Sequence, residues 1–499
     1  MDLIANLQIG FGAVLTADAI FYCLLGALLG TLIGVLPGIG PAATISLLLP
    51  FTFGIEPLPA LIMLSGIYYG SQYGGSTTAI LLNLPGESSS VITAVDGYKM
   101  ARQGKAGKAL ATAAIGSFVA GCVATIVIAA VAAPVAGLAL KFGAPEYFSL
   151  VVLGIVTCIV MAHGSVLKAF AMVVLGILLG TVGVDANTGV ERFMFGLPGL
   201  GDGISFVAAA MGLFGLTEII SNLSGQSDEA RGTHKVGSLL LSRKDVRDVT
   251  PPILRGTVIG SILGVLPGSG ALLASFISYS FEKRIARDPS RFGQGAIEGV
   301  AAPEAANNAA AQTSFIPMLT LGIPSNAIMA MMIGAMLIQG VQPGPSMIEK
   351  QPELFWGLIA SMWIGNAMLL ILNLPLVGLW ARIISVPYNL LYPFILVLCC
   401  VGVFAINNSE FDILLMCGFA VLGVLLTRSG CEPAPLLLGM ILGPMLEMYF
   451  GRAMALSRGD LTIFVTRPVS AILLAVALGV ILLVLLPKFS RAREEAFVE

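Results

Sequence analysis

Long apolar runs, broken by short polar stretches, fill most of this chain and constrain its fold more than any other feature. The sequence of 499 residues is 57% hydrophobic and only 11% charged, whereas an ordinary soluble domain carries about 25% charged residues. A chain with so few charges cannot cover its surface with polar groups, so the remaining surface must face lipid. The sequence therefore predicts an integral membrane protein. Its formal net charge of −2 gives no electrostatic reason to expect a nucleic-acid partner.

The apolar runs differ in length, and this difference predicts spanning helices mixed with shorter segments. A spanning helix needs about 20 apolar residues, while a run of about 10–14 indicates a re-entrant or broken segment. We therefore expect an all-α polytopic membrane protein with roughly 10–12 transmembrane helices plus re-entrant hairpins. One polar stretch, "SNLSGQSDEARGTHKVGSLLLSRKDVRD", separates two halves of the chain between Ser221 and Asp248.

Two nearly identical motifs interrupt apolar runs 230 positions apart. "GVLPGIG" spans Gly34 to Gly40, and "GVLPGSG" spans Gly264 to Gly270. The identities extend before each motif as one leucine and two glycines at matching positions, namely Leu24, Gly26 and Gly30 against Leu254, Gly256 and Gly260. A weaker similarity follows each copy, at a different offset: "LLNLPGES" begins at position 81 and "TLGIPSNA" at position 320.

This similarity predicts an internal duplication. Residues 1–220 would form membrane repeat 1 with its tip at 36–41, and residues 251–450 membrane repeat 2 with its tip at 266–271. Between the two repeats, residues 221–250 would form a polar cytoplasmic linker. Residues 451–499 would add a C-terminal transmembrane helix and a short cytoplasmic tail.

The distribution of basic residues predicts how the two repeats are oriented. No Lys or Arg precedes Lys99, whereas basic residues flank the second motif on both sides, at 243–255 and at 283–291. Lys and Arg accumulate in cytoplasmic loops. If each motif is the tip of a hairpin, the first hairpin enters from the periplasm and the second from the cytoplasm, which is an inverted-topology repeat. A broken crossing helix at each motif is the alternative.

Paired Pro-Gly tips at membrane depth predict a binding site. Non-helical backbone in a membrane is tolerated only where it is buried in protein or lines a cavity. A half-helix that starts at such a tip presents free N–H groups and a partial positive charge to anions. Secondary transporters place substrate and coupling ions between such elements. The alternative is a packing kink, because Gly and Pro are frequent in transmembrane helices.

Polar, small-residue stretches at 68–90 and 303–317 follow the two motifs. Their hydroxyl and amide groups suit a carboxylate beside helix dipoles, or a hard monovalent cation bound by oxygens. Hydrogen bonds that only join helices are the alternative. We therefore predict the following substrate-binding residues: Gly38, Gly40, Ser71, Ser76, Thr77, Thr78, Gly268, Ser269, Gly270, Asn307, Asn308 and Thr313.

Glu304 is a candidate for ion coupling, because a carboxylate within a run of alanines is costly at membrane depth. It would carry a proton or balance a cation, with Asn307, Asn308 and Thr78 as the other ion-coupling candidates. Because Glu298 is close in sequence, a position of Glu304 at the membrane interface is the alternative. Acids near segment ends are expected to be solvated: Glu87, Asp96, Asp185, Glu191 and Asp202.

Several motifs are absent, and this narrows the function. There is no GxxxxGK[ST], HExxH or GxSxG, and there are only two histidines. We therefore expect no enzyme activity, no catalytic residues, no bound metal other than a possible sodium ion, and no other cofactor. The basic stretch from Lys99 to Lys108 is expected to contact anionic membrane lipid at the cytoplasmic face.

Four stretches resemble the large membrane subunit of the tripartite tricarboxylate transporters, over roughly residues 15–440. They are "GVLPGIGPAATISLLLPFTFG", "YYGSQYGGSTTAILLNLPGESSSVITAVDGYKMARQGKAGKAL", "GVLPGSGALLASFISYSFEK" and "AAPEAANNAAAQTSFIPMLTLGIPSNAIMA". In the last stretch, Ser325 stands where we would expect a glycine.

The resemblance implies a carrier of the bacterial inner (cytoplasmic) membrane that imports di- or tricarboxylates such as citrate. It would use a sodium or proton gradient instead of ATP, together with a small membrane subunit of about four helices and a periplasmic solute-binding protein. By analogy with other hairpin carriers, an elevator-like motion is also implied. An anion channel and a non-transporting membrane scaffold or receptor subunit are the other functions that we consider.

Overall fold

The computed structural model describes residues 3–36, 40–162, 165–184, 189–224, 236–266, 270–383 and 388–485. Helices dominate these residues, and the two short strands β1 (Gly183–Val184) and β2 (Glu191–Arg192) pair antiparallel, with Gly183 opposite Arg192. The all-α prediction is confirmed.

Before position 225 the helices are α1 (Leu3–Val14), α2 (Ala17–Val35), α3 (Pro41–Leu48), η1 (Leu49–Gly54), α4 (Pro57–Leu82), η2 (Ser88–Ser90), α5 (Val91–Arg102), α6 (Ala106–Ala139), α7 (Ala144–Met161), α8 (Val166–Gly180), η3 (Pro198–Leu200), α9 (Phe206–Ala210), the π-helix η4 (Met211–Leu216) and α10 (Thr217–Ser224). The remaining helices are α11 (Arg243–Leu263), α12 (Gly270–Ile285), η5 (Pro289–Arg291), α13 (Glu298–Thr313), α14 (Phe315–Leu321), α15 (Ala327–Ile338), α16 (Met347–Lys350), α17 (Pro352–Asn373), α18 (Val377–Ile383), α19 (Tyr388–Asn407), α20 (Glu410–Arg428), α21 (Pro433–Ser457), α22 (Ile463–Thr466) and α23 (Pro468–Leu485).

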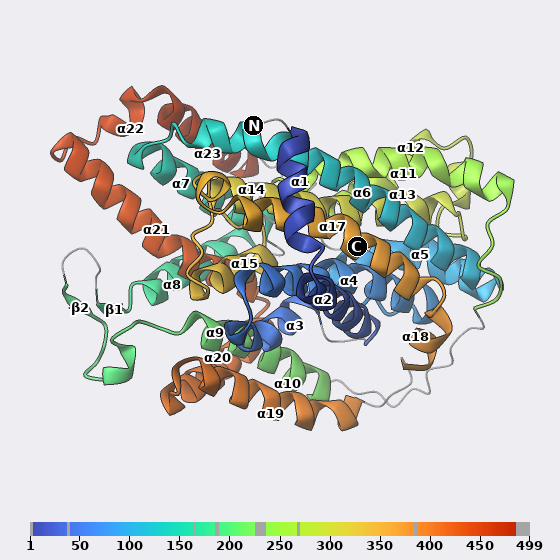
Figure 1. The fold of residues 1–499 in the computed structure, drawn as a ribbon, viewed down its shortest axis with the longest axis horizontal. Coiled ribbons are helices and arrows are strands. Elements are labelled where there is room, and N and C mark those ends of the chain that lie inside the picture. Colours follow the sequence, from blue (N-terminus) through green and yellow to red (C-terminus); the bar gives the residue numbers. More distant parts are fainter. Residues whose placement is uncertain are drawn as a thin grey trace.

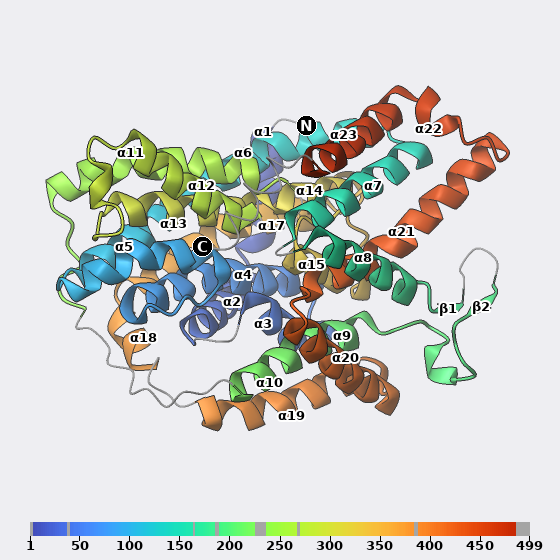
Figure 2. The ribbon, with the colours of Figure 1, turned by 180° about the vertical axis from the view of Figure 1, so that it is seen from behind.

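The helices form three groups around α4, and α13 lies in the group that contains α11 and α12. Helices α5, α6, α11 and α12 lie at one end, α7, α8, α21 and α23 at the other, and α9, α10, α19 and α20 along one side (Figures 1 and 2). Every residue of α4 from Pro59 to Leu81 is buried, as is every residue of α13 from Gly299 to Thr313. The helical parts of the two polar stretches are therefore buried inside the molecule.

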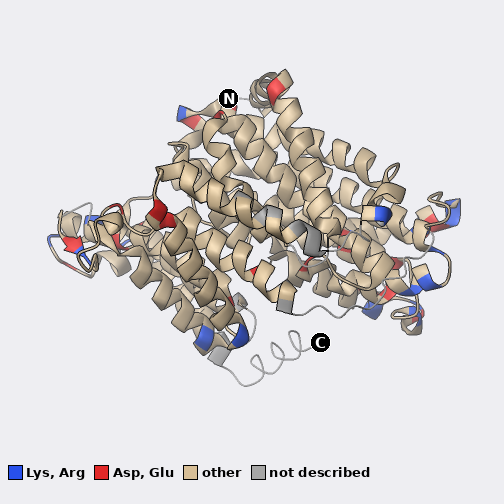
Figure 3. Ribbon diagram, turned by 90° about the horizontal axis from the view of Figure 1, so that it is seen from below, with Lys and Arg blue, Asp and Glu red and all other residues tan. Residues whose placement is uncertain are grey.

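The outer surface of the molecule suits a membrane. Among the described residues, five helices are long and apolar enough to cross one, and seven apolar helices are shorter, with 10–17 residues. Charged residues gather mainly towards the ends of the molecule and leave most of the ribbon between them uncharged (Figure 3). The protein is thus a multi-pass membrane protein, since its exposed apolar side chains need lipid around them.

Two matching glycine stripes join α2 to α4 and α11 to α13. A Cβ on Gly26, Gly30 or Gly34 would overlap a backbone carbonyl of α4, and a Cβ on Gly256, Gly260 or Gly264 would overlap one of α13. Small residues let transmembrane helices approach closely. The glycines repeated in the sequence are therefore the contact face of each pair, and this contact explains why they occur at every fourth position.

The partner helices also correspond to each other, displaced by 239 positions (Ile67 of α4 and Ala306 of α13, for example). At the same displacement, Asn83 ends α4 and Gly322 ends α14, both with left-handed backbone, φ 58° and 72°. A proline then follows two residues later in each copy, at positions 85 and 324, and the chain stays non-helical.

The two loops that follow these helices are closed by equivalent hydrogen bonds. In the first, the Gly86 N–H donates to the Gly75 carbonyl at 3.5 Å, and in the second, the Ser325 hydroxyl donates to the Ser314 carbonyl at 3.1 Å. The unexpected Ser325 thus replaces a backbone donor by a side-chain donor at the same place.

The arms of the second Pro-Gly motif lie side by side. Arg255 of α11 donates two hydrogen bonds to Glu282 of α12, at 2.6 and 2.8 Å. Helix α11 begins at Arg243, inside the stretch assigned to the linker, because Ser242 and Asp245 form a capping box at its start. The helices on either side of the first motif, α2 and α3, are in less contact with each other than α11 and α12 are. Helix α3 packs instead against the π-helix η4, where Leu47 lies next to Gly215.

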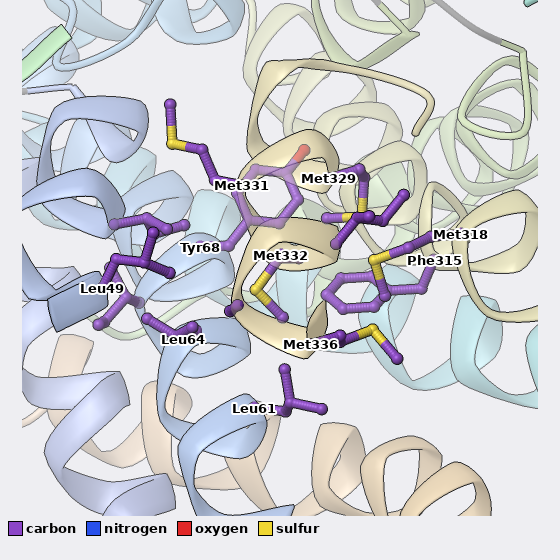
Figure 4. Close-up of a cluster of buried hydrophobic side chains, with 14 of the residues drawn as sticks. Leu49, Leu61, Leu64, Tyr68, Phe315, Met318, Met329, Met331, Met332 and Met336 are labelled. Carbon is purple, nitrogen blue, oxygen red and sulfur yellow. The ribbon is translucent and has the colours of Figure 1, made fainter. Parts of the chain in front are cut away.

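A methionine-rich cluster fills the space between α4 and α15. Met329, Met331, Met332 and Met336 of α15 are fully buried and lie among Phe315 and Met318 of α14, Leu49 of η1, and Leu61, Leu64 and Tyr68 of α4 (Figure 4). Methionine side chains are flexible and adapt to irregular gaps. This contact between the two halves of the chain can therefore tolerate small shifts.

The prediction for Asp96 is wrong. We expected it to be solvated, but it is fully buried. Its carboxylate accepts the N–H groups of Gly293, Gly295 and Ala296 at 2.7–2.9 Å and the hydroxyl of Tyr279 at 2.9 Å. These four donors replace water and attach the loop before α13 to α5.

The other acids expected to be solvated differ among themselves. Glu191 and Asp202 are exposed, as predicted. Glu87 is half-buried and lies at the cavity described below. Asp185 lies outside the described residues.

Candidate functional site

Both Pro-Gly motifs open onto one cavity of about 400 Å³. Gly40, Pro41 and Ala42 line it from the start of α3, and Gly270, Ala271 and Leu272 line it from the start of α12. The last residues of the two motifs, Gly40 and Gly270, are 230 positions apart in sequence and line the same cavity.

Residues in and next to the two loops after α4 and α14 also line this cavity, together with residues of α7, η4, α10 and α21. Residues 86–89 line it from the first loop and residues 326–328 from the second, with Tyr68 and Gln72 of α4 between them. The cavity is thus formed where four helices are interrupted, which is where backbone amides and carbonyls are free to face a ligand.

The start of α3 carries a specific electrostatic contact. Gly40 is the N-cap of α3, and Pro41 at the first position has no N–H to leave unpaired. The Gly40 N–H donates to the Glu218 carboxylate of α10 at 2.6 Å. An anion at this point is stabilised by the helix dipole.

The cavity is rich in carboxylates. Glu87, Glu218 and Glu432 line it, and among the described residues no Lys, Arg or His does. An anionic ligand therefore meets helix N-termini and hydrogen-bonding groups, together with three carboxylates.

A buried polar network extends from the cavity to Glu304. Glu87 accepts the Ser89 hydroxyl at 2.6 Å and the Asn307 amide at 3.0 Å. One turn away, Glu304 is fully buried and accepts the hydroxyls of Ser76 at 2.6 Å and Thr93 at 2.5 Å. Glu304 is therefore enclosed by the helices around it and is not exposed to solvent.

A small void of about 10 Å³ lies beside Glu304. Tyr73, Thr77, Ser117 and Asn373 line it together with Glu304. The Tyr73 hydroxyl and the Asn373 side-chain oxygen are buried and have no hydrogen-bond partner. The void is close to the minimum space for one water molecule or a small ion, and its oxygen atoms suit a hard cation or a proton.

The sequence was compared with known proteins. A profile described as "Tripartite tricarboxylate transporter TctA family" matches residues 20–438. The chain belongs to this family. The TctA family is a family of transporters, not of enzymes, and the tripartite architecture implies partner subunits.

Two relatives of this TctA-family protein come from Agrobacterium vitis. An "Uncharacterized 52.8 kDa protein in TAR-I ttuC' 3'region" is 60% identical over 499 residues, which cover 100% of this chain and 99% of the relative. An "Uncharacterized protein in TAR-II ttuC' 3'region" is 57% identical over 240 residues, which cover 48% of this chain and 99% of the relative. No solved structure matches the chain.

The structure divides the predicted site residues of this TctA-family protein into groups. Gly40 and Gly270 line the cavity. Four others belong to the network or to the void beside Glu304: Ser76, Thr77, Asn307 and Asn308, the last through its hydrogen bond of 2.6 Å to Ser117. The remaining residues at the tips, Gly38, Gly268 and Ser269, lie outside the described residues.

Three predicted residues contact neither space. The hydroxyls of Ser71, Thr78 and Thr313 donate to carbonyl oxygens of their own helices, at 2.7, 2.9 and 3.0 Å. Serine and threonine commonly satisfy their hydroxyls in this way when they face a helix contact. Their place in the structure is the packing between helices.

Residues that the sequence analysis did not select also line the cavity, among them Tyr68, Gln72, Glu218, Asn326 and Glu432. For Asn326 a signal existed, namely the similarity between "LLNLPGES" and "TLGIPSNA" that marks both loops. For Glu218 and Glu432 the sequence holds no comparable repeat, because each comes from an element outside the two motifs.

Proposed function

We propose that this protein is the large transmembrane subunit of a binding-protein-dependent secondary transporter in the bacterial inner membrane. It imports di- or tricarboxylates with a sodium or proton gradient, together with a small membrane subunit and a periplasmic solute-binding protein. The observation that supports this proposal best is the single cavity lined by the starts of both α3 and α12. Half-helix N-termini that face one cavity suit an anionic substrate.

The cavity has a suitable size and chemistry for such a substrate. About 400 Å³ lies within the usual range of roughly 300–1,000 Å³ for small-molecule sites. The N-terminal ends of α3 and α12 would receive carboxylates, and Gln72 and Asn326 would bind hydroxyl or further carboxylate oxygens. Backbone amides and neutral side chains accept several related acids, while a solute-binding protein selects among them.

The carboxylates around the cavity support coupling to a cation. Glu87 and Glu218 line the cavity with no ion pair among the described residues, and would repel a dicarboxylate unless cations or protons enter with it. Glu304 and the void beside it provide a place for the coupling ion, since Asn307 connects this region to Glu87 at the cavity. The coupling residues in this proposal are Glu304, Asn307 and Asn308.

Two halves in inverted orientation, residues 1–220 and 251–450, are part of the proposal. The matching glycine stripes, the left-handed residues Asn83 and Gly322, and the equivalent loop hydrogen bonds support the duplication. The asymmetric basic flanks of the two motifs support the inversion. Such a pair of repeats provides two related half-sites that meet at the centre of the membrane.

The test is uptake of labelled citrate and succinate by proteoliposomes that contain this chain, the small subunit and the binding protein. Under an imposed sodium or proton gradient, the wild type should accumulate at least one acid. A channel would give conductance that does not respond to a cation gradient, and a scaffold would give no uptake with all partners present.

Gly40→Leu tests the cavity itself. A side chain at Gly40 meets only ordinary contacts and the backbone there has φ −77°, so the variant should fold while its side chain fills the cavity. Uptake should fall at least about tenfold, which corresponds to about 1.4 kcal/mol. Gly12→Leu on α1, where a Cβ meets nothing, is the matched control. Equal uptake in both variants would contradict the assignment of the cavity.

Glu304→Gln tests the coupling region. Uptake driven by the gradient should be lost, because a neutral amide can neither carry a proton nor balance a cation. Glu298→Gln on the same helix is the control, since Glu298 is paired with the exposed Arg291 and lies outside the network. If Glu304→Gln accumulates substrate in the same response to the gradient, the coupling ion binds elsewhere.

A further inference from the structure

We propose that the Glu218 carboxylate is an internal competitor of the transported acid. It occupies the Gly40 N–H when no substrate is bound, and it leaves that N–H when a substrate carboxylate arrives. This inference rests on the proposed function, and it assigns a gating role to one residue of the cavity.

The first observation is that Glu218 occupies the position an anionic ligand would take. Its Oε1 atom lies 2.6 Å from the Gly40 nitrogen, at the start of α3 and at the wall of the cavity. A carboxylate on an N-cap N–H gains both a charge-assisted hydrogen bond and the helix dipole. A substrate carboxylate would gain the same two interactions at the same atom, so the two carboxylates exclude each other.

The second observation concerns what else holds Glu218. Gly40 is its hydrogen-bond partner, and no ion pair of Glu218 occurs among the described residues. The side chain is half-buried, beside two more cavity carboxylates, Glu87 and Glu432. Its attachment to Gly40 is therefore a single hydrogen bond, which a competing anion can replace without breaking a larger network.

The third observation is that the contact joins two different parts of the chain. Glu218 belongs to α10, which continues the π-helix η4 and packs with it against α20, whereas Gly40 belongs to the Pro-Gly motif between α2 and α3. π-helical turns occur frequently at functional sites. The hydrogen bond thus holds the start of α3 against α10 while the cavity is empty, and its release frees the start of α3 to close on substrate.

The first test is substrate affinity in the reconstituted tripartite complex, measured as the apparent KM for citrate and succinate. Glu218→Gln keeps the size of the side chain and removes its charge. It should lower the apparent KM at least about tenfold, because the neutral amide loses the charge-assisted hydrogen bond and the helix-dipole attraction with which the carboxylate competes for the Gly40 N–H. Glu432→Gln removes the same charge from the same cavity without touching Gly40.

The second test needs no substrate. Hydrogen–deuterium exchange of residues 40–48 in the purified full-length protein should be faster in Glu218→Ala than in the wild type, while Glu432→Ala should leave exchange in this segment unchanged. Size-exclusion profiles of all variants report whether they remain folded, and the near-isosteric Glu218→Gln serves where the alanine variant does not.

The outcomes separate this inference from the proposed function. An equal fall in KM for Glu218→Gln and Glu432→Gln, a rise in KM for Glu218→Gln, or unchanged exchange in Glu218→Ala would each overturn the competition. If the wild-type complex takes up no acid under either gradient, the proposed function fails. The exchange experiment then still shows whether Glu218 holds the start of α3, although a role as competitor is refuted with the function.

Discussion

The two glycine stripes make a quantitative prediction about the stability of the protein. Gly30→Ala on α2 and Gly260→Ala on α11 add one methyl group to corresponding contacts. In the first, the new Cβ would overlap the carbonyl of Ile67, and in the second the carbonyl of Ala306. Both obstacles are helix backbone, which cannot move aside as a flexible side chain can.

The expected cost follows from two opposing effects. Alanine is favoured over glycine in an open helix position by about 0.5–1 kcal/mol. An inserted group in a well-packed contact costs about 1–3 kcal/mol, and here the upper part of that range applies because the obstacle is backbone. Each variant should therefore lose about 1–2 kcal/mol of unfolding free energy, which is the difference between the two effects. The two sites share no contact partner, so the double variant should lose the sum.

The assay is reversible unfolding of the purified protein in mixed detergent micelles, followed by circular dichroism. Gly137→Ala on α6 is the control, because a Cβ there meets nothing within 4 Å. The control should be neutral or slightly stabilised. If Gly30→Ala and Gly260→Ala unfold like the control, close approach of the two helix pairs does not contribute to the stability of the fold.

Three further predictions concern other polar contacts. Asp96→Ala should lower the unfolding free energy by about 3–5 kcal/mol, because it leaves four donors without their charged acceptor. Hydrogen exchange at residues 286–297 should become faster in this variant. Exchange at the wild-type rate there would contradict the role of this carboxylate. Arg255→Met should lower the unfolding free energy by about 2–3 kcal/mol, because it leaves the buried Glu282 unpaired. The loss is smaller than for a fully buried pair, since Arg255 is 39% exposed. Adding Glu282→Leu should restore most of the loss, and no recovery would mean that the arginine acts through packing alone. Hydrogen bonds from Lys108 and from Ser242 lower the pKa of Asp245 from its usual 3.8 to about 2. The stability that this shift contributes is present above about pH 4 and disappears between about pH 4 and pH 2. Lys108→Met should weaken that loss in acid unfolding, and an unchanged acid profile would show that the pair with Lys108 is not stabilising.

Local properties of the sequence were enough to predict the membrane class, the helical fold and the positions of the chain breaks. Apolar run length and low charge depend only on composition, and proline and glycine disturb a helix wherever they occur. The repeated "GVLPGIG" and "GVLPGSG" motifs, with the glycines before them, were recognisable because a duplicated contact needs the same small residues at the same spacing. The part of the cavity wall formed by the starts of α3 and α12 was therefore predictable.

The sequence did not predict which polar residues face the cavity and which only contribute to packing between helices. Ser71 and Ser76 lie five positions apart on α4. The Ser71 hydroxyl contacts only a carbonyl of its own helix, whereas the Ser76 hydroxyl contacts both the Gln72 carbonyl and Glu304, 228 positions away. The choice depends on which helix lies against each face of α4, and the sequence of α4 alone does not contain that information.

Tertiary structure alone decided the environment of the acids. Asp96 is buried because α12 and the loop before α13, about 200 positions away, supply its hydrogen-bond donors, and Glu218 reaches the cavity because α10 packs beside a motif 178 positions earlier. A buried carboxylate in a membrane protein is stable only where surrounding elements supply hydrogen-bond donors to it. The sequence fixes where such groups occur along the chain, and the packing of helices determines whether each one is solvated, structural or exposed to a ligand.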